Sequence, residues 1–126
     1  MTSDRNPLAR HGGLSYLEIP TSDPARSSAF YQRIVGWNID QRSARDFRFS
    51  DGGGHLIGRW VDGRAAAREP AMLAYFYVND VDAAVVLAGS LGGETVKPPA
   101  LEGDIRVAQV RDPSGNLIGL WQFIAG

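Results

Sequence analysis

The sequence contains no cysteine, and this absence excludes disulfide bonds and metal sites built from thiolates. An excess of charge of one sign is also missing, because 13 Lys and Arg and 14 Asp and Glu leave a formal net charge of −1. The basic residues are scattered along the chain, so we expect no nucleic acid as a partner. Residues 1–13 are polar and hold no apolar run of the kind that a signal peptide or a membrane span needs. We therefore expect a flexible N-terminal arm at residues 1–13, a cytoplasmic location and no membrane partner.

The rest of the chain has the composition of a globular protein, with 44% hydrophobic and 21% charged residues overall. Its length favours one domain over residues 14–126. Residues 14–20 have the character of a strand. Asp23 and Pro24 then favour the start of a helix, because Asp accepts a hydrogen bond from the first turn and Pro fits the first helical position. Gly36 favours the end of that helix.

The same order of elements returns in the second half of the chain. Residues 73–78 predict a strand, Asp80 predicts a helix cap, and residues 81–91 predict an apolar helix followed by two glycines. The caps Asp23 and Asp80 are as far apart in the sequence as the glycines that end the two helices. The repeat therefore holds without a gap across strand and helix.

Short segments with the character of strands follow each predicted helix. They cover residues 37–41, 46–50 and 55–61 in the first half and residues 94–97, 105–110 and 116–123 in the second. Gly52–Gly54 and Asp112–Asn116 lie where hairpin turns are needed. We therefore predict an α+β fold of two βαβββ modules, at about residues 14–61 and 71–123, joined by a polar connector at residues 62–70.

Several short segments of the two halves form a specific combination. They are Glu18–Asp23, Phe30-Tyr31, Gly36-Trp37, Val78–Ala84, Leu91–Gly93, Asp112–Asn116 and Gly119–Trp121. Together they resemble the glyoxalase/bleomycin resistance/dioxygenase superfamily, also called the vicinal oxygen chelate (VOC) superfamily, over roughly residues 14–123. The resemblance implies paired modules that form a curved mixed sheet around a cleft, commonly completed by dimerisation. Because an open half-cleft would leave apolar sheet exposed, we expect a homodimer.

Metal-dependent members of this family hold His, Glu or Gln ligands at four inward positions. The resemblance places those positions at Tyr16, near Gly58, at Leu73 and at Gly119. Shifting the second position by one residue reaches only Ile57 or Arg59. None of these residues is a normal ligand, since a first-row metal needs imidazole, carboxylate or similar donors. The resemblance is then to metal-free members, which include antibiotic-sequestering proteins, and we expect no metal and no cofactor.

The cleft of such a fold would be lined by alternate residues of its strands. The side chains expected to bind a ligand are those of Tyr16, Glu18, Leu56, Trp60, Leu73, Tyr75, Tyr77 and Trp121. Gly58 and Gly119 would leave volume for that ligand. This largely aromatic lining favours a flat small organic molecule held by stacking and oriented by tyrosine hydroxyls. Alternatively, the aromatic side chains fill the interior.

Glu18 is the one ionisable residue on the predicted inward faces. A carboxylate desolvated among tyrosines is a candidate general base, and it is equally a candidate anchor for a cationic ligand. In a purely structural role it would instead be held by a backbone N–H or a tyrosine hydroxyl. His11 and His55 are expected in exposed loops, and His55 is also a candidate proton carrier at the mouth of the cleft.

Three functions are consistent with this pattern. The first is a metal-independent protein that binds an aromatic or amphipathic small molecule, such as an antibiotic. The second is a cofactor-independent isomerase or lyase that uses Glu18 as general base while a tyrosine stabilises an oxyanion. The third is a metal-dependent lyase or dioxygenase. The missing metal ligands and the aromatic lining together favour the first function.

Overall fold

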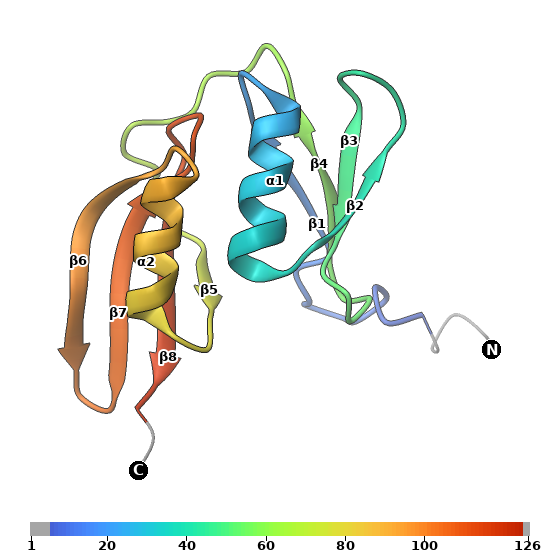
Figure 1. Cartoon of the computed structure of the whole chain (residues 1–126). Helices are drawn as coiled ribbons and strands as arrows, with labels where there is room; N and C mark the ends of the chain where they lie inside the picture. Colours follow the sequence, from blue (N-terminus) through green and yellow to red (C-terminus); the bar gives the residue numbers. More distant parts are fainter. Residues whose placement is uncertain (1–5, 125–126) are drawn as a thin grey trace. The chain divides into compact units, whose positions relative to one another are not determined.

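Each half of the chain forms its own βαβββ unit in the computed structural model, which describes residues 6–124 (Figure 1). The first unit ends at Ala65 and the second begins at Ala66. The predicted α+β class and the order of elements in both modules are confirmed. Neither helix among residues 6–124 is long and apolar enough to cross a membrane. Residues 1–5 of the predicted arm lie outside the described residues, and residues 6–13 contain two turns.

The first unit is a four-stranded mixed sheet with a helix on one face. Its elements are β1 (Tyr16–Pro20), α1 (Pro24–Val35), β2 (Asn38–Gln41), β3 (Phe47–Ser50) and β4 (Ile57–Val61). The strand order is β1-β4-β3-β2, in which β1 runs parallel to β4 and the other neighbours are antiparallel. Helix α1 packs against β2, β3 and β4.

Helix α1 begins and ends where the sequence predicts. The Oδ1 atom of Asp23 accepts a hydrogen bond from the backbone N–H of Arg26 at 3.2 Å, and Pro24 occupies the first turn. Gly36 takes the left-handed conformation with φ of 75°, and its N–H donates to the carbonyl oxygen of Gln32. This backbone conformation is strained for residues with a Cβ, so glycine ends the helix at low cost.

The second unit repeats this arrangement with different lengths. Its elements are β5 (Tyr75–Tyr77), α2 (Val81–Ser90), β6 (Glu94–Glu102), β7 (Ile105–Arg111) and β8 (Leu117–Phe123). The strand order is β5-β8-β7-β6, and β5 runs parallel to β8. Asp80 caps α2 by accepting from the N–H of Ala83 at 3.0 Å, as predicted. The glycine with positive φ after α2 is Gly92 and not Gly93, so the predicted repeat holds for the caps and not for the helix ends.

Strand β6 is longer than the sequence predicts. It was expected at residues 94–97, yet it continues through Pro98 and Pro99 to Glu102. Proline lacks an N–H and is tolerated only at sheet edges or bulges. Both conditions are met here, because β6 has one neighbouring strand and its register with β7 shifts twice before Ala100.

The hairpin between β7 and β8 confirms the predicted turn at residues 112–116. The carboxylate of Asp112, which is 2% exposed, accepts hydrogen bonds from the backbone N–H groups of Ser114 and Asn116, both at 2.9 Å. The side-chain amide of Asn116 donates to the second carboxylate oxygen at 2.7 Å. These bonds satisfy a buried carboxylate and set the turn that joins the two strands.

Each sheet has one face under its helix and one face without a helix, which we call its open face (Figure 1). The core under α1 is rich in aromatic residues and contains Ile19, Phe30, Tyr31, Ile34, Trp37, Phe47, Phe49 and Trp60. The core under α2 is aliphatic and contains Val78, Val81, Ala84, Ala88, Ala108, Val110, Ile118 and Leu120. Each fully buried large apolar side chain stabilises the fold by roughly 1.5–3 kcal/mol.

Candidate functional site

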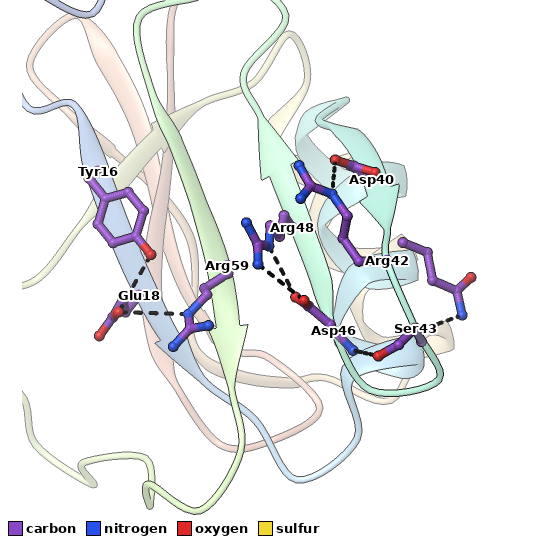
Figure 2. A network of polar contacts seen from close by, with 9 residues as sticks. Tyr16, Glu18, Asp40, Arg42, Ser43, Asp46, Arg48 and Arg59 are labelled. Carbon is purple, nitrogen blue, oxygen red and sulfur yellow. Dashed lines mark hydrogen bonds and ion pairs between the residues drawn. The ribbon is translucent and has the colours of Figure 1, made fainter.

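Four charged side chains form one row across the open face of the first sheet. The register pairs Glu18 with Arg59, Arg59 with Arg48, and Arg48 with Asp40, so each strand contributes one residue. Figure 2 shows the two guanidinium groups of this row between Glu18 and Asp40. We call these four residues the charged row.

Glu18 has several polar partners in this row and beside it. Its carboxylate accepts a hydrogen bond from Nη2 of Arg64 at 3.0 Å and lies 3.8 Å from Nε of Arg59. The hydroxyl of Tyr16 donates to it at 3.5 Å (Figure 2). The expectation that Glu18 is the one ionisable residue on the inward faces is wrong, because Arg48 and Arg59 share the open face with it.

Arg48 is held by a carboxylate of its own strand region. Its Nε and Nη2 atoms donate to the two carboxylate oxygens of Asp46, each at 3.1 Å (Figure 2). The hydrogen bond from Arg48 lowers the pKa of Asp46 against the opposing effect of desolvation, and the charges of Arg48, Arg42 and Arg59 lower it further. The same bond raises the pKa of Arg48. Asp46 is therefore ionised at neutral pH and orients the Arg48 fork.

A hollow of about 290 Å³ lies beside the charged row within the first unit. It is lined by Tyr16, Asn38, Ile39, Asp40, Arg42, Arg48, Phe49, Ser50, Ile57 and Gly58. Tyr16 is 50% exposed, so a large part of its side chain is open to solvent. The lining combines guanidinium, hydroxyl and amide groups and the carboxylate of Asp40 with the apolar side chains of Ile39, Phe49 and Ile57.

The open face of the second unit is aromatic instead of charged. Tyr75 and Tyr77 of β5 are 46% and 48% exposed, and Phe123 of β8 is 59% exposed. The ring of Trp121 meets those of Tyr77 and Phe123 edge to face, each at 4.9 Å between centroids. We call Tyr75, Tyr77, Trp121 and Phe123 the aromatic face. Such rings favour apolar and stacking contacts with a flat molecule.

Polar groups and a second hollow accompany the aromatic face. The side-chain amide of Gln109 donates to the hydroxyl oxygen of Tyr75 at 3.0 Å. A hollow of about 370 Å³ is lined by Tyr75, Glu102, Ile105, Val107 and Trp121. An aromatic wall with a carboxylate at its rim matches the mixed character of sites for small organic molecules.

Gly58 and Gly119 do not leave volume for a ligand, contrary to the prediction. A Cβ at Gly119 would overlap the ring of its cross-strand partner Tyr75, and a Cβ at Gly58 would overlap the carbonyl oxygen of Leu17 and the ring of Phe49. The space beside each glycine is already filled by the protein. Both glycines therefore serve close packing inside their own units.

The predicted orientation of Trp60 toward a ligand is also wrong. Trp60 is 3% exposed and packs with the rings of Tyr31, Trp37 and Phe49 in the core under α1. Successive side chains of a strand point to opposite faces. Burial of Trp60 therefore brings its neighbour Arg59 to the open face.

The remaining predicted residues lie outside the strands. Leu56 and Leu73 are both half-buried. Leu56 directly precedes β4, and Leu73 lies shortly before β5. His55 is exposed in the turn before β4, and its carbonyl oxygen accepts from Nη2 of Arg10 at 3.3 Å. His11 is exposed in an earlier turn.

The residues at the four positions implied by the family do not fit a metal ion. Glu18 pairs with Arg59 in the first sheet, and Tyr75 pairs with Gly119 in the second. Glu18 and Tyr75 occupy equivalent positions before the helix caps Asp23 and Asp80. Arg59, and not Gly58, is therefore the counterpart of Gly119. A guanidinium cation repels a metal ion, and glycine offers no side-chain donor. Within residues 6–124 no group of three or more His, Cys, Asp or Glu residues could hold a metal ion.

Sequence reasoning missed several residues of these faces, namely Asp40, Arg48 and Arg59 of the charged row, Phe123 of the aromatic face, and Gln109 beside it. Arg48 lies between Phe47 and Phe49, a pattern that is typical of a strand with one buried and one solvated face. Arg59 next to Trp60 likewise indicates a strand with one buried and one solvated face. A charged residue in the middle of a short strand identifies its open face, and this signal was present in the sequence.

The chain is similar in sequence to known proteins. Residues 13–120 match the family model described as Glyoxalase/Bleomycin resistance protein/Dioxygenase superfamily. The chain is 29% identical over 126 residues to the protein named "Putative glyoxylase CFP32" of Mycobacterium tuberculosis (strain CDC 1551 / Oshkosh), with 90% of this chain and 46% of that protein covered. The chain thus spans about half the length of this curated relative.

Two solved structures are similar to the chain. One is a glyoxalase/bleomycin resistance protein/dioxygenase family enzyme from Burkholderia phytofirmans PsJN, with a TM-score of 0.72, 22% identity, and coverage of 88% of this chain and 98% of that one. The other is TnmS3, an antibiotic binding protein from Streptomyces sp. CB03234, with a TM-score of 0.63, 27% identity, and coverage of 87% and 94%. The first likeness supports the fold, and the second concerns a protein that binds an antibiotic.

Proposed function

Because this chain belongs to the glyoxalase/bleomycin resistance/dioxygenase superfamily, we propose that it is a metal-independent binding protein for an aromatic or amphipathic small molecule, such as an antibiotic. The observation that carries the proposal is the aromatic face with its adjoining hollow of about 370 Å³. Exposed aromatic side chains that gather on one surface are typical of a binding site. The likeness to an antibiotic binding protein of 27% identity gives further support.

The arrangement of rings explains how a flat molecule would be held. Tyr77, Trp121 and Phe123 present edges and faces at different angles, so a planar ligand would gain both stacking and edge contacts. The hydrogen bond from Gln109 to Tyr75 orients the tyrosine hydroxyl. Tyr75 and Glu102 would then supply the few polar contacts that orient the ligand.

The alternative of a cofactor-independent isomerase or lyase with Glu18 as general base has one supporting contact, the hydroxyl of Tyr16 beside the carboxylate. Against it, Glu18 faces the guanidinium groups of Arg59 and Arg64. A substrate would have to displace these contacts before the carboxylate could accept a proton from it. The metal-dependent lyase or dioxygenase has less support, because the residues at the implied ligand positions do not fit a metal.

The proposal is tested by titrating metal-stripped protein with a panel of aromatic antibiotics in a calorimeter. We expect at least one compound to bind, and Trp121→Ala and Tyr77→Ala each to weaken it at least tenfold. Val86→Ala is the control, since Val86 is an exposed apolar residue of α2, which packs on the opposite face of the sheet. Binding that appears only after a divalent metal is restored would overturn the proposal.

Mass spectrometry of the bound compound separates binding from catalysis. Recovery of an unchanged compound supports the binding protein. Chemical conversion that disappears in Glu18→Gln would establish the enzyme alternative instead. Elemental analysis of the protein as purified checks the metal-independent part of the proposal, which a stoichiometric divalent metal would contradict.

A homodimer in the cytoplasm completes the proposal. Support for the dimer comes from large apolar side chains that are exposed in each unit, among them Leu14, Leu101 and Phe123. Light scattering of the eluted protein is expected to give twice the mass of 13.6 kDa. A monomer at all concentrations would remove the dimer from the proposal without affecting the aromatic face.

A further inference from the structure

We propose that the open face of the first unit binds an oxyanion, the carboxylate or phosphate group of a small molecule, at Arg48 and Arg59. This goes beyond the proposed function, because these residues belong to the first unit and the aromatic face belongs to the second. The carrying observation is that Arg48 and Arg59 are direct cross-strand partners on the same face. Like charges placed directly opposite each other destabilise a sheet. The carboxylates of Glu18 and Asp46 compensate part of this repulsion, and an anion that binds both cations would compensate it further.

The carboxylates around the pair engage the two arginines unequally. Glu18 and Asp40 occupy the two outer strands of the charged row, so the two middle strands both carry cations. Asp46 engages Arg48 through Nε and Nη2. Arg59 is less well engaged, because its Nε atom lies 3.8 Å from the carboxylate of Glu18.

The Nε atom of Arg59 provides a second, independent observation. Among the described residues it is one of the buried side-chain nitrogen atoms without a hydrogen-bond partner. A buried N–H of a charged group without a partner costs free energy. The rest of the side chain is accessible, since 44% of its surface is exposed. A small adjustment of Arg59 toward an incoming oxyanion would satisfy the N–H and neutralise the repulsion at once.

The surroundings indicate what kind of molecule would carry the oxyanion. The row next to the charged row contains Tyr16, Ile57, Ser50 and Asn38, which are paired in register across the sheet. These side chains and Arg48 line the hollow of about 290 Å³. Hydroxyl and amide groups there would bind further oxygen atoms, while Ile57 would contact a short apolar body. Guanidinium groups recognise planar carboxylates and phosphates through paired hydrogen bonds.

The test uses small probes without a ring, which cannot stack on the aromatic face. Acetate and inorganic phosphate are titrated at constant ionic strength, with acetamide as the neutral match for acetate, and the Nε–Hε resonances of arginine are followed by NMR. We expect acetate or phosphate to shift the Arg48 and Arg59 resonances with saturation, and acetamide to leave them unchanged. The probe with the higher affinity identifies carboxylate or phosphate as the preferred group. Absence of a saturable shift with both anions overturns the proposal.

Substitutions of the two arginines test whether they form the binding site. Arg48→Gln and Arg59→Gln are each expected to weaken the bound anion at least tenfold, whereas Arg48→Lys and Arg59→Lys retain part of the affinity. Arg26→Gln is the matched control, because Arg26 is exposed on α1, which covers the other face. Unchanged affinity in both Gln variants would overturn the proposal. This readout is separate from the antibiotic titration, so either site can fail while the other holds.

Discussion

The two units of this protein share an order of elements, yet most aromatic side chains lie on the helix-covered face in the first unit and on the open face in the second. In the first unit the rings of Tyr31, Trp37, Phe49 and Trp60 are buried under the helix, and charged side chains occupy the open face. In the second unit the buried core is aliphatic, and the aromatic rings lie on the open face. The last strands show this most directly, since Trp60 pairs with buried Ile19 and Trp121 with exposed Tyr77.

This difference shows that two units with the same order of helices and strands can expose different kinds of side chain. Both sheets satisfy the same requirement, an apolar face against a helix, with different residue classes. The open faces are then free to diverge because they do not contribute to the core of their own unit. The first unit therefore suits an anionic group, and the second suits an aromatic body.

The largest expected effect comes from truncating Trp60 of the first unit, with Trp121 of the second unit as its comparison. Trp60→Ala is expected to lower the free energy of unfolding by about 3–5 kcal/mol, because it leaves a cavity in the aromatic core. Trp121→Ala, on the open face, is expected to cost about 1 kcal/mol or less. Urea unfolding of both variants measures the contrast. Equal losses would break the distinction between a buried and an open aromatic cluster.

The two packed glycines give a smaller contrast. Gly58→Ala is expected to cost about 1–3 kcal/mol, since the new Cβ would press on the backbone of Leu17 and on buried Phe49. Gly119→Ala is expected to cost less, because the half-exposed Tyr75 ring can swing into solvent. Urea unfolding gives the two losses, and chemical shifts of Tyr75 report the displaced ring. A larger loss for Gly119→Ala would mean that the aromatic face is as rigid as the core.

The pH dependence of stability compares the carboxylates of the two units. Arginine partners lower the pKa of Asp46 in the first unit and of Asp82 in the second below the usual value of 3.8. Their stabilising contribution is therefore complete above this value and is lost as the pH falls through the lower pKa of the folded state. We expect the urea midpoint to fall in this acidic range, and Asp46→Asn and Asp82→Asn each to flatten the fall.

Asp82 is exposed and Asp46 is only half-buried, so each effect should be a small shift of the urea midpoint. A wild-type slope in Asp46→Asn, beside a flattened slope in Asp82→Asn, would show that the ion pair of the open face contributes nothing to folding.

The smallest effect is expected at the rim of the charged row. Arg64 is 54% exposed at its side chain and pairs with Glu18 at 3.0 Å. Exposed ion pairs typically contribute about 0–1 kcal/mol. Arg64→Gln should therefore leave the unfolding free energy within about 0.5 kcal/mol of the wild type. A loss above about 1 kcal/mol would show that the first open face is held more rigidly than a solvated surface.

Much of the fold could be predicted because its signals are local. Asp23, Pro24 and Gly36 act within a few residues of themselves, and their roles as caps follow from their own chemistry. The length of β6 could not be predicted in this way. Its continuation through Pro98 depends on its place at the edge of the sheet, which is a property of the tertiary fold.

The orientation of the site residues required more than local patterns. Alternation states that Arg59 and Trp60 face opposite ways, and it does not state which of them faces the helix. The assignment of Trp60 to the ligand rested on the inward position that the resemblance gave to Gly58, because alternation then placed Trp60 on the same face. The charge on Arg59 and Arg48 was the better guide, because burial of a guanidinium group without a partner costs more than exposure of an indole ring.

The prolines of β6 have a consequence beyond the length of that strand. An exposed edge strand offers unpaired N–H and carbonyl groups that invite strands from other molecules to extend the sheet. Pro98 and Pro99 offer no N–H, and the register shifts around them interrupt the even spacing that such an addition needs. This edge is thereby protected against aggregation, although the same unit exposes a cluster of aromatic rings on its open face.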